Sequence, residues 1–96
     1  IRTPDDLEGA VDRLQVVEGA VVDASYNGGR GYLNFGADYK TDFTVTFEAS
    51  VRTMFEQAGI DPLAMKGRRI RVRGWLEFFN GPMIEISHPG QIEVVE

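Results

Sequence analysis

Residues 67–82, "GRRIRVRGWLEFFNGP", show the most regular alternation of polar and apolar residues in the 96-residue chain. Side chains of a β-strand point alternately to its two faces, so this period predicts a strand with one buried face. The side chains expected to point outward are Arg69, Arg71, Arg73 and Trp75. Those expected to enter a core are Ile70, Val72, Leu76 and Phe78. The Asn-Gly-Pro sequence at 80–82 then predicts a tight turn.

Four further stretches alternate in the same way, at residues 15–29, 31–36, 42–49 and 83–96. Gly19 lies inside the first stretch, and a glycine within a strand often marks a bend. Asn27, Gly28 and Gly29 favour a hairpin turn, because Asn-Gly and Gly-Gly accept positive φ angles. The last stretch is interrupted near His88 and Pro89. The side chains expected inside are Leu33, Phe35, Phe43, Val45 and Phe47, and those expected outside are Tyr32, Asn34, Thr44, Thr46 and Glu48.

Helical signals lie between the third and fourth expected strands and at the N-terminus. Ser50 is expected to cap a helix that ends at Gly59, with an apolar stripe of Val51, Met54, Phe55 and Ala58. A second short turn is expected from Asp61 as cap and Pro62 as first residue to Gly67. Apolar residues at helical spacing near the N-terminus also predict a short helix within residues 1–14.

The predicted order is strand, strand, strand, helix, strand, strand. A long, bent first strand lets one sheet curl until its edges meet, which removes open strand edges. This order is typical of the five-stranded oligonucleotide/oligosaccharide-binding (OB) barrel, whereas a sandwich more often has seven strands and no central helix. We therefore expect an all-β OB-fold domain over residues 15–96, preceded by a helical extension over residues 1–14.

Composition limits the chemistry that the chain can support. There are 10 Lys and Arg residues against 15 Asp and Glu residues, a net charge of -5, so a surface that attracts polyanions everywhere is excluded. The absence of cysteine excludes disulfides, thiol catalysis and cysteine-bound zinc. His88 has no second histidine with which to share a metal, and only Asp38 and Asp42 could approach one another to hold a cation weakly. We expect no catalytic residues, no metal and no cofactor, and no apolar run is long enough to span a membrane.

Two strings, "YLNFGADYKTDFTVTF" at 32–47 and "GRRIRVRGWLEFFNGPMIEISHPGQIEVV" at 67–95, resemble a known family. They are similar to the OB-fold domain that accompanies the nuclease domain in bacterial thermonuclease-like (staphylococcal-nuclease-type) proteins. The resemblance covers about residues 16–95. It implies an accessory module related to nucleic-acid-binding OB domains, often in periplasmic or exported proteins, while the residues themselves leave the compartment open. It does not imply catalysis by this chain.

The first candidate site is the strand face on which OB-folds usually bind their ligands, flanked by two loops. Aromatic side chains can stack on bases there, and hydroxyl and amide groups can read base edges. The alternative is that Tyr and Thr are present because they suit a half-buried strand surface. The candidate residues are Tyr26, Asn27, Arg30, Tyr32, Asn34, Thr44, Thr46, Phe79 and Asn80.

The second candidate is the basic row of the strand at 69–78. Arg69, Arg71 and Arg73 would lie about 6–7 Å apart on one face, close to the phosphate spacing of a single strand, and Trp75 continues that face. The alternative, which the number of acidic residues favours, is that these arginines pair across strands with the last strand. The acidic residues expected as partners are Glu85, Glu93 and Glu96.

Two functions follow from these patterns. The first is a non-catalytic OB-fold module that weakly binds single-stranded DNA or RNA, or a similar polyanion, as an accessory to a nuclease-like protein. The second is a structural or protein-interaction domain that contacts a nuclease domain or another partner through exposed aromatic residues. Affinity that falls steeply with salt would indicate the first, and salt-tolerant association the second.

Overall fold

The computed structural model describes residues 13–36, 43–78 and 81–95, with the side chain of Arg13 not described. Most of the helix predicted within residues 1–14 lies outside these ranges. Its last expected residues, Arg13 and Leu14, lie in strand β1. The candidate residues that also lie outside them are Asp38, Asp42, Phe79, Asn80 and Glu96.

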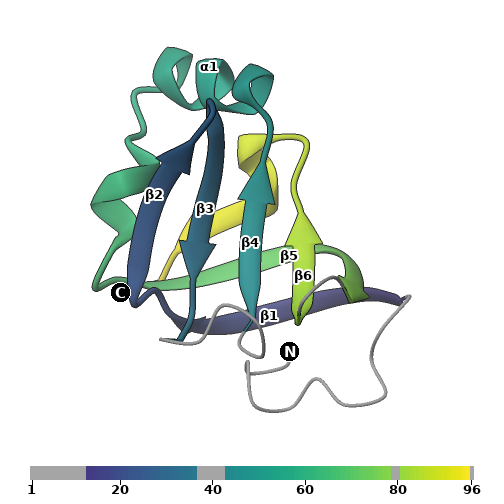
Figure 1. Ribbon diagram of the computed structural model, residues 1–96. Coiled ribbons are helices and arrows are strands. Elements are labelled where there is room, and N and C mark those ends of the chain that lie inside the picture. Colours follow the sequence, from purple (N-terminus) through teal and green to yellow (C-terminus); the bar gives the residue numbers. More distant parts are fainter. Residues whose placement is uncertain (1–12, 37–42, 79–80, 96) are drawn as a thin grey trace.

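Seven strands form one sheet that curls into a barrel-like shape (Figure 1). They are β1 (Arg13–Ala20), β2 (Asp23–Asn27), β3 (Arg30–Asn34), β4 (Thr44–Phe47), β5 (Arg69–Phe78), β6 (Pro82–Glu85) and β7 (Ile92–Val94). The spatial order is β1-β5-β6-β4-β3-β2, and β7 also pairs with β5. All pairs are antiparallel except β4 with β6. The two ends of this order, β1 and β2, are consecutive in the chain and are separated by only Val21 and Val22.

The expected all-β fold with one α-helix is confirmed, but the expected count of five strands is wrong. The first expected strand is divided into β1 and β2 at Val21 and Val22 rather than at Gly19, which lies within β1. At this break the amide of Val21 donates to the carbonyl of Arg68, and that of Val22 to the carbonyl of Asn34. The chain therefore changes partner here, from the β5 side to the β3 side. The last expected strand is divided by the 3₁₀ turn η2 (Pro89–Gln91) into β6 and β7, as the His88-Pro89 interruption predicted.

The helix α1 (Ala49–Gln57) covers one end of the barrel (Figure 1). It begins one residue before the expected cap Ser50, with Glu48 in the N-cap position. It ends at Gln57, with Ala58 in the C-cap position, whereas the sequence predicted an end at Gly59. Gly59 follows with a φ of 74°, and two bonds close the helix, from the amide of Gly59 to the carbonyl of Glu56 and from that of Ile60 to the carbonyl of Phe55. Phe55 is buried as predicted, but Met54 is 38% exposed, so the expected apolar stripe is narrower than its sequence spacing indicated.

The second helical turn is confirmed as the 3₁₀ segment η1 (Pro62–Met65). Asp61 caps it by accepting a hydrogen bond of 3.0 Å from the amide of Leu63. Met65 is buried in the core, whereas Leu63 is 40% exposed.

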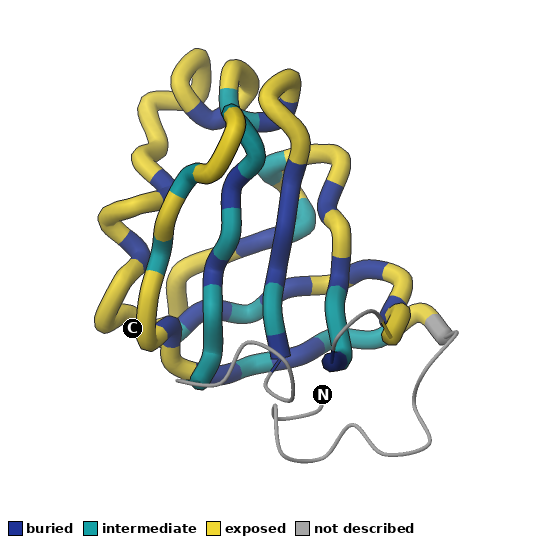
Figure 2. The backbone as a smooth tube through the Cα atoms, viewed as in Figure 1, coloured by how far each residue is buried: buried dark blue, intermediate teal, exposed yellow. Residues whose placement is uncertain are grey.

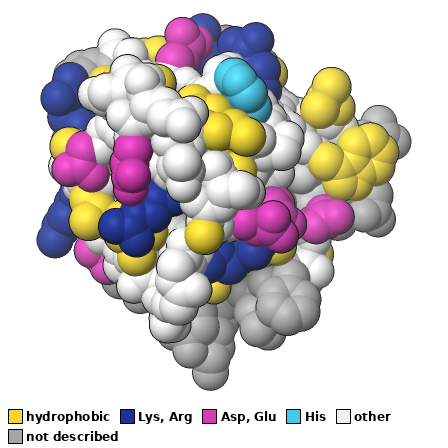
Figure 3. Space-filling view, turned by 90° about the horizontal axis from the view of Figure 1, so that it is seen from above, with side chains coloured by type: hydrophobic (Ala, Val, Ile, Leu, Met, Phe, Trp, Pro, Cys, Tyr) yellow, Lys and Arg dark blue, Asp and Glu magenta, His cyan; other side chains and the backbone are white. Residues whose placement is uncertain are grey.

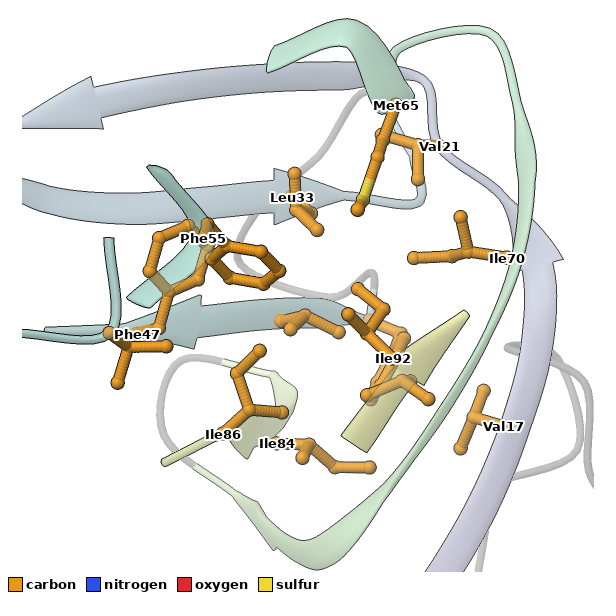
Figure 4. Close-up of a cluster of buried hydrophobic side chains, with 14 of the residues drawn as sticks. Val17, Val21, Leu33, Phe47, Phe55, Met65, Ile70, Ile84, Ile86 and Ile92 are labelled. Atoms are coloured by element: carbon orange, nitrogen blue, oxygen red, sulfur yellow. The ribbon is translucent and has the colours of Figure 1, made fainter. Parts of the chain in front are cut away.

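The core fills the barrel with side chains from every strand except β2 and from α1 and η1 (Figure 4). Buried positions follow the inner sheet faces, and α1 is mostly exposed (Figure 2). The buried aromatic residues include Phe47 and Phe55, whose ring centroids lie 5.2 Å apart. Ile70, Val72 and Leu76 are fully buried as predicted, but Phe78 is 66% exposed. Phe78 is the last residue of β5 and pairs with Pro82 of β6.

Candidate nucleic-acid interface

The outer sides of β3, β4 and β6 form one continuous surface, which we term the β3–β4 face. Tyr32 lies opposite Thr46, and Thr46 lies opposite Glu85 on the next strand. The members of the face are Arg30, Tyr32, Asn34, Thr44, Thr46 and Glu85. Five of these side chains were predicted as candidates from the sequence. Glu85 was missed, because strand alternation does not reveal that β6 pairs in parallel with β4.

Glycines at two points give this face its shape. Gly28 and Gly29 have φ angles of 62° and 85°, and this two-residue turn starts β3 at Arg30, as the Asn-Gly-Gly sequence predicted. At Gly31 the ring of Phe47 approaches the backbone closely, since a Cβ atom there would lie 2.2 Å from Phe47 Cζ. The Phe47 ring can therefore fill the core directly beneath the β3–β4 face only because residue 31 is glycine.

Arg30 is held in place by two neighbours on the β3–β4 face. Its Nε donates to Thr46 Oγ1 at 2.9 Å, and its Nη2 lies 2.8 Å from Glu85 Oε2. Thr46 Oγ1 in turn donates to the carbonyl of Gly31 at 2.9 Å. The prediction that Thr46 faces solvent was wrong: it is only 1% exposed, with its hydroxyl fully hydrogen-bonded. The guanidinium is therefore fixed over the sheet rather than extended into water.

Toward the other end of the face, Thr44 and Asn34 contact each other directly. Thr44 Oγ1 donates to Asn34 Oδ1 at 3.2 Å, as expected for a cross-strand pair. Tyr32 lies between this pair and Arg30, is partly exposed, and is the one aromatic side chain on the face among the described residues. A base could stack on its ring from the solvent side.

Tyr26, although predicted with Tyr32, lies on the other side of the sheet. It pairs with Gly31, and its ring meets Phe47 edge-on with centroids 6.2 Å apart. The guanidinium of Arg52 covers the ring at 4.0 Å, and burial raises the pKa of the Tyr26 hydroxyl. We conclude that Tyr26 is a packing residue that joins β2 to α1. Asn27 is exposed beside Arg30 at the hairpin.

The arginine row of β5, defined as Arg69, Arg71 and Arg73, is bound to carboxylates. Glu18 on β1 lies 2.9 Å from Arg69 Nε and 2.8 Å from Arg71 Nη2, and hydrogen bonds from Arg71 and then Arg69 lower the pKa of Glu18. Glu93 on β7 lies 3.7 Å from Arg71 and 3.9 Å from Arg73. Pairing with the last strand is thus confirmed for Glu93, but not for Glu85, which binds Arg30 instead.

Glu18, the closest partner of the arginine row, was missed in the sequence. Its position among valines and glycine in "QVVEGA" marks it as an outward residue of its strand, which was the available signal. Only the pairing of β1 with β5 places it opposite Arg71.

Ion pairs are the rule on the described surface. Six cationic side chains lie within 3.9 Å of a carboxylate, and these are Arg30, Arg52, Lys66, Arg69, Arg71 and Arg73. Seen from the α1 end, basic and acidic side chains are interspersed over the surface (Figure 3). A ligand that binds through phosphate groups would have to compete with these carboxylates.

Two large apolar side chains lie exposed side by side on the outside of β1 and β5. Leu14 is 73% exposed and Trp75 is 53% exposed, and the two residues are direct cross-strand partners. Trp75 thus points outward as predicted, on strand β5 rather than on the β3–β4 face.

Within residues 13–36, 43–78 and 81–95, no three His, Cys, Asp or Glu side chains come together in a way that could hold a metal ion. None of the helices in those ranges is long and apolar enough to cross a membrane.

No protein-family model and no curated protein matches this sequence. Solved structures, in contrast, share its fold. The chain is similar to OBody AM1L10 bound to hen egg-white lysozyme, with 15% identity and a TM-score of 0.66 over 100% of this chain and 93% of that chain. It is also similar to the S. pombe Stn1–Ten1 complex, with 15% identity and a TM-score of 0.58 over 86% of this chain and 58% of that chain.

A third similar structure is the asparaginyl-tRNA synthetase from Pyrococcus horikoshii, with 13% identity and a TM-score of 0.58. The match covers 98% of this chain but 21% of the synthetase. At these identities the likeness concerns the fold. Together with the strand order and the position of α1, it identifies the chain as an OB-like barrel.

Proposed function

We propose that this chain is a non-catalytic OB-fold module that weakly binds single-stranded DNA or RNA on the β3–β4 face. The observation that carries the proposal is the fixed arrangement of Arg30, Thr46 and Tyr32 on the outside of two neighbouring strands. An aromatic ring beside an ordered guanidinium offers stacking and hydrogen bonds to a base. This is also the surface on which OB-folds usually bind oligonucleotides.

Base contacts, rather than phosphate contacts, are expected to supply most of the affinity. Arg30 is already paired with Glu85 at 2.8 Å, so its positive charge is balanced by a carboxylate before any phosphate approaches. The arginine row is held by Glu18 and Glu93 in the same way. The logarithm of the affinity should therefore fall less steeply with salt than the number of arginines suggests.

The test is a fluorescence-anisotropy titration of labelled single-stranded DNA and RNA at low and moderate salt. Tyr32→Ala should weaken binding at least about fivefold, because stacking on an aromatic side chain contributes about 1–3 kcal/mol per base. Trp75→Ala is the matched control, since it also removes an exposed aromatic ring but lies off the face. Equal binding by the wild type and Tyr32→Ala would show that the β3–β4 face is not the site.

We further propose that the module accompanies a nuclease domain and helps it to hold its substrate, as the resemblance to thermonuclease-associated domains implies. Joining the chain to such a nuclease domain should lower the KM for single-stranded substrate and leave kcat nearly unchanged, because the module adds binding without chemistry. An unchanged KM would remove this part of the proposal.

A second candidate function is contact with another protein through Leu14 and Trp75. Their exposures of 73% and 53% on adjacent strands favour this reading, since tryptophan is among the residues that dominate protein interfaces. One similar structure, the OBody, is described as bound to a protein, hen egg-white lysozyme. Sedimentation of wild type and Trp75→Ser would test whether copies of this chain, or the chain and an added nuclease domain, associate through this pair in a salt-tolerant manner.

A further inference from the structure

Glu85 is the one acidic side chain among the described members of the β3–β4 face, and its position there calls for an explanation. Its Oε2 binds Arg30 at 2.8 Å, and within the described chain its Oε1 accepts no hydrogen bond. The Glu85 side chain is 42% exposed and that of Arg30 is 32% exposed, so a ligand can reach both. The pair thus presents a free carboxylate oxygen beside guanidinium N–H groups.

The pair is well ordered for its degree of exposure. Arg30 cannot rotate freely, because Nε is bonded to Thr46, which is itself bonded to the backbone of Gly31. A guanidinium fixed in this way holds Glu85 through Oε2, and the second carboxylate oxygen can still accept hydrogen bonds from a ligand. Hence donor and acceptor groups keep a constant spacing on the surface, which reading a base edge requires.

A phosphate group is a poor ligand for this arrangement. The Glu85 carboxylate repels an anion and already occupies part of the guanidinium, so a phosphate would face like charge at hydrogen-bonding distance. A base edge carries no net charge and can satisfy both partners without separating them. The pair therefore favours a nucleobase over the backbone.

Among the common bases, guanine best matches a carboxylate beside a guanidinium. Its Watson–Crick edge places the O6 acceptor next to two donors, N1–H and N2–H, and unpaired bases of single strands expose this edge. Adenine and cytosine each offer one donor group beside an acceptor nitrogen, and uracil and thymine offer one N–H between two acceptors. Only guanine gives the carboxylate two donors and the guanidinium one acceptor.

Tyr32 lies at a distance suited to hold such a base. Tyr32, Thr46 and Glu85 occupy the same register position on β3, β4 and β6. Two strand spacings separate Tyr32 from Glu85, about 9–10 Å at the backbone. A purine that stacks on Tyr32 can therefore present its edge to Glu85 and Arg30.

We infer that the Arg30–Glu85 pair is a base-reading subsite that prefers guanine, with Tyr32 as its stacking platform. This inference rests on the proposed function, because it names the base that the β3–β4 face selects. It predicts that a single guanine in an otherwise uniform thymine or uracil strand raises the affinity. The increase should be about fivefold or more, as for one base read by a bidentate pair.

The experiment measures anisotropy with labelled strands of about ten nucleotides, which suits a single OB domain. Each strand carries one central guanine, hypoxanthine, adenine, cytosine or thymine. Hypoxanthine lacks only the N2 amino group, so it should lose part of the guanine preference. Glu85→Gln should abolish most of that preference, because an amide offers the two guanine N–H donors one acceptor oxygen in place of the two of a carboxylate. Glu93→Gln is the matched control, since Glu93 is a surface carboxylate that forms ion pairs with Arg71 and Arg73 on another part of the barrel.

The outcomes separate this inference from the proposed function. Guanine preference that is lost in Glu85→Gln and kept in Glu93→Gln supports the subsite. Equal affinity of the wild type for all strands overturns the subsite while the proposed function stands, and so does a preference that survives Glu85→Gln. No binding of any strand overturns the proposed function and the inference together. Circular dichroism of each variant confirms that the fold is retained.

Discussion

The arginine row and the β3–β4 face are both arginine-containing strand surfaces, and the structure treats them in opposite ways. The row has three arginines, yet Glu18 and Glu93 fasten them to the two neighbouring strands. The β3–β4 face has a single arginine, but Arg30 stands beside an accessible tyrosine and a carboxylate with a free oxygen. The number of cations on a strand therefore indicates less about ligand binding than the partners that those cations already have.

The largest difference between the two regions is expected in the free energy of unfolding, when a glycine that packs closely against the core in each region is replaced by alanine. Gly31→Ala would place a Cβ atom 2.2–2.7 Å from three atoms of the buried Phe47 ring, so we expect a loss of about 1–3 kcal/mol in the free energy of unfolding. On the β5 side, the Cβ atom of Gly74→Ala would lie 2.6 Å from Ile84 Cγ2 and 3.3 Å from Gln91 Nε2, with a single contact under 3.0 Å, so this change should cost less. Urea unfolding of both variants measures the difference, and an unaltered midpoint for Gly31→Ala would refute the close packing beneath the β3–β4 face.

The role of Glu18 in holding the arginine row predicts a pH dependence of stability. Hydrogen bonds from Arg71 and Arg69 lower its pKa below the ordinary value of 4.5, so ionised Glu18 favours the folded state. This contribution is fully present above pH 4.5 and is lost as the pH falls through the lower, folded-state value. Wild type should exceed Glu18→Gln in stability at neutral pH, and the gap should narrow in acid.

Urea titrations at several pH values measure this gap, with the exposed Glu77→Gln as control on the neighbouring strand. A difference between wild type and Glu18→Gln that stays constant down to strongly acidic pH would mean that the ion pairs do not stabilise the fold.

A smaller effect is expected for nucleic-acid binding when the arginine row is altered. Arg73 is the most exposed of the three, with 58% of its side chain accessible and Glu93 at 3.9 Å. If the row is structural, Arg73→Gln should change the affinity for single-stranded DNA less than about twofold and lower the salt slope by well under one unit. A slope that falls by about one would show that Arg73 contacts a phosphate, and the comparison between the two regions would then be reversed.

The smallest effect is expected for the fluorescence of Trp75 when an oligonucleotide binds. Trp75 is the one tryptophan of the chain and lies on the same strand side as the arginine row. Because it is 53% exposed and away from the β3–β4 face, its fluorescence should be quenched readily by acrylamide, with or without bound oligonucleotide. Protection of Trp75 by single-stranded DNA would place the ligand on β1 and β5 instead.

Local chemistry determined those parts of the fold that were predicted correctly. The alternation through Ile70 and Val72, the Gly28-Gly29 hairpin and the Asp61 cap depend on neighbours within a few residues, and each is confirmed. The errors concern positions whose surroundings come from distant segments. Met54 and Phe78 have the right spacing but lie beyond the area that the barrel covers, whereas Thr46 is buried because Arg30 closes over it.

The candidate site was predicted in the same uneven way. The residues of β3 and β4 share a face because they alternate on adjacent strands, which the sequence indicates. Tyr26 was placed with them because it borders the same hairpin, yet its register opposite Gly31 turns it toward Phe47. The partners Glu85 and Glu18 depend on pairings between strands far apart in the chain, and no local pattern reveals them.

The bend at Val21 and Val22 has a consequence for the order of folding. Residues of β1 find their partners only on β5, so that Arg69 and Arg71 reach Glu18 across 51 and 53 residues of chain. The β2–β3 hairpin, on the other side of the bend, needs no more than a two-residue turn. During synthesis β1 is made before its partner β5, so it stays unpaired until β5 has been made. β2 can pair with β3 as soon as the short turn between them has been made. Forming such non-local contacts is slow. Small all-β domains fold on the order of milliseconds to seconds, and we expect a folding time in this range.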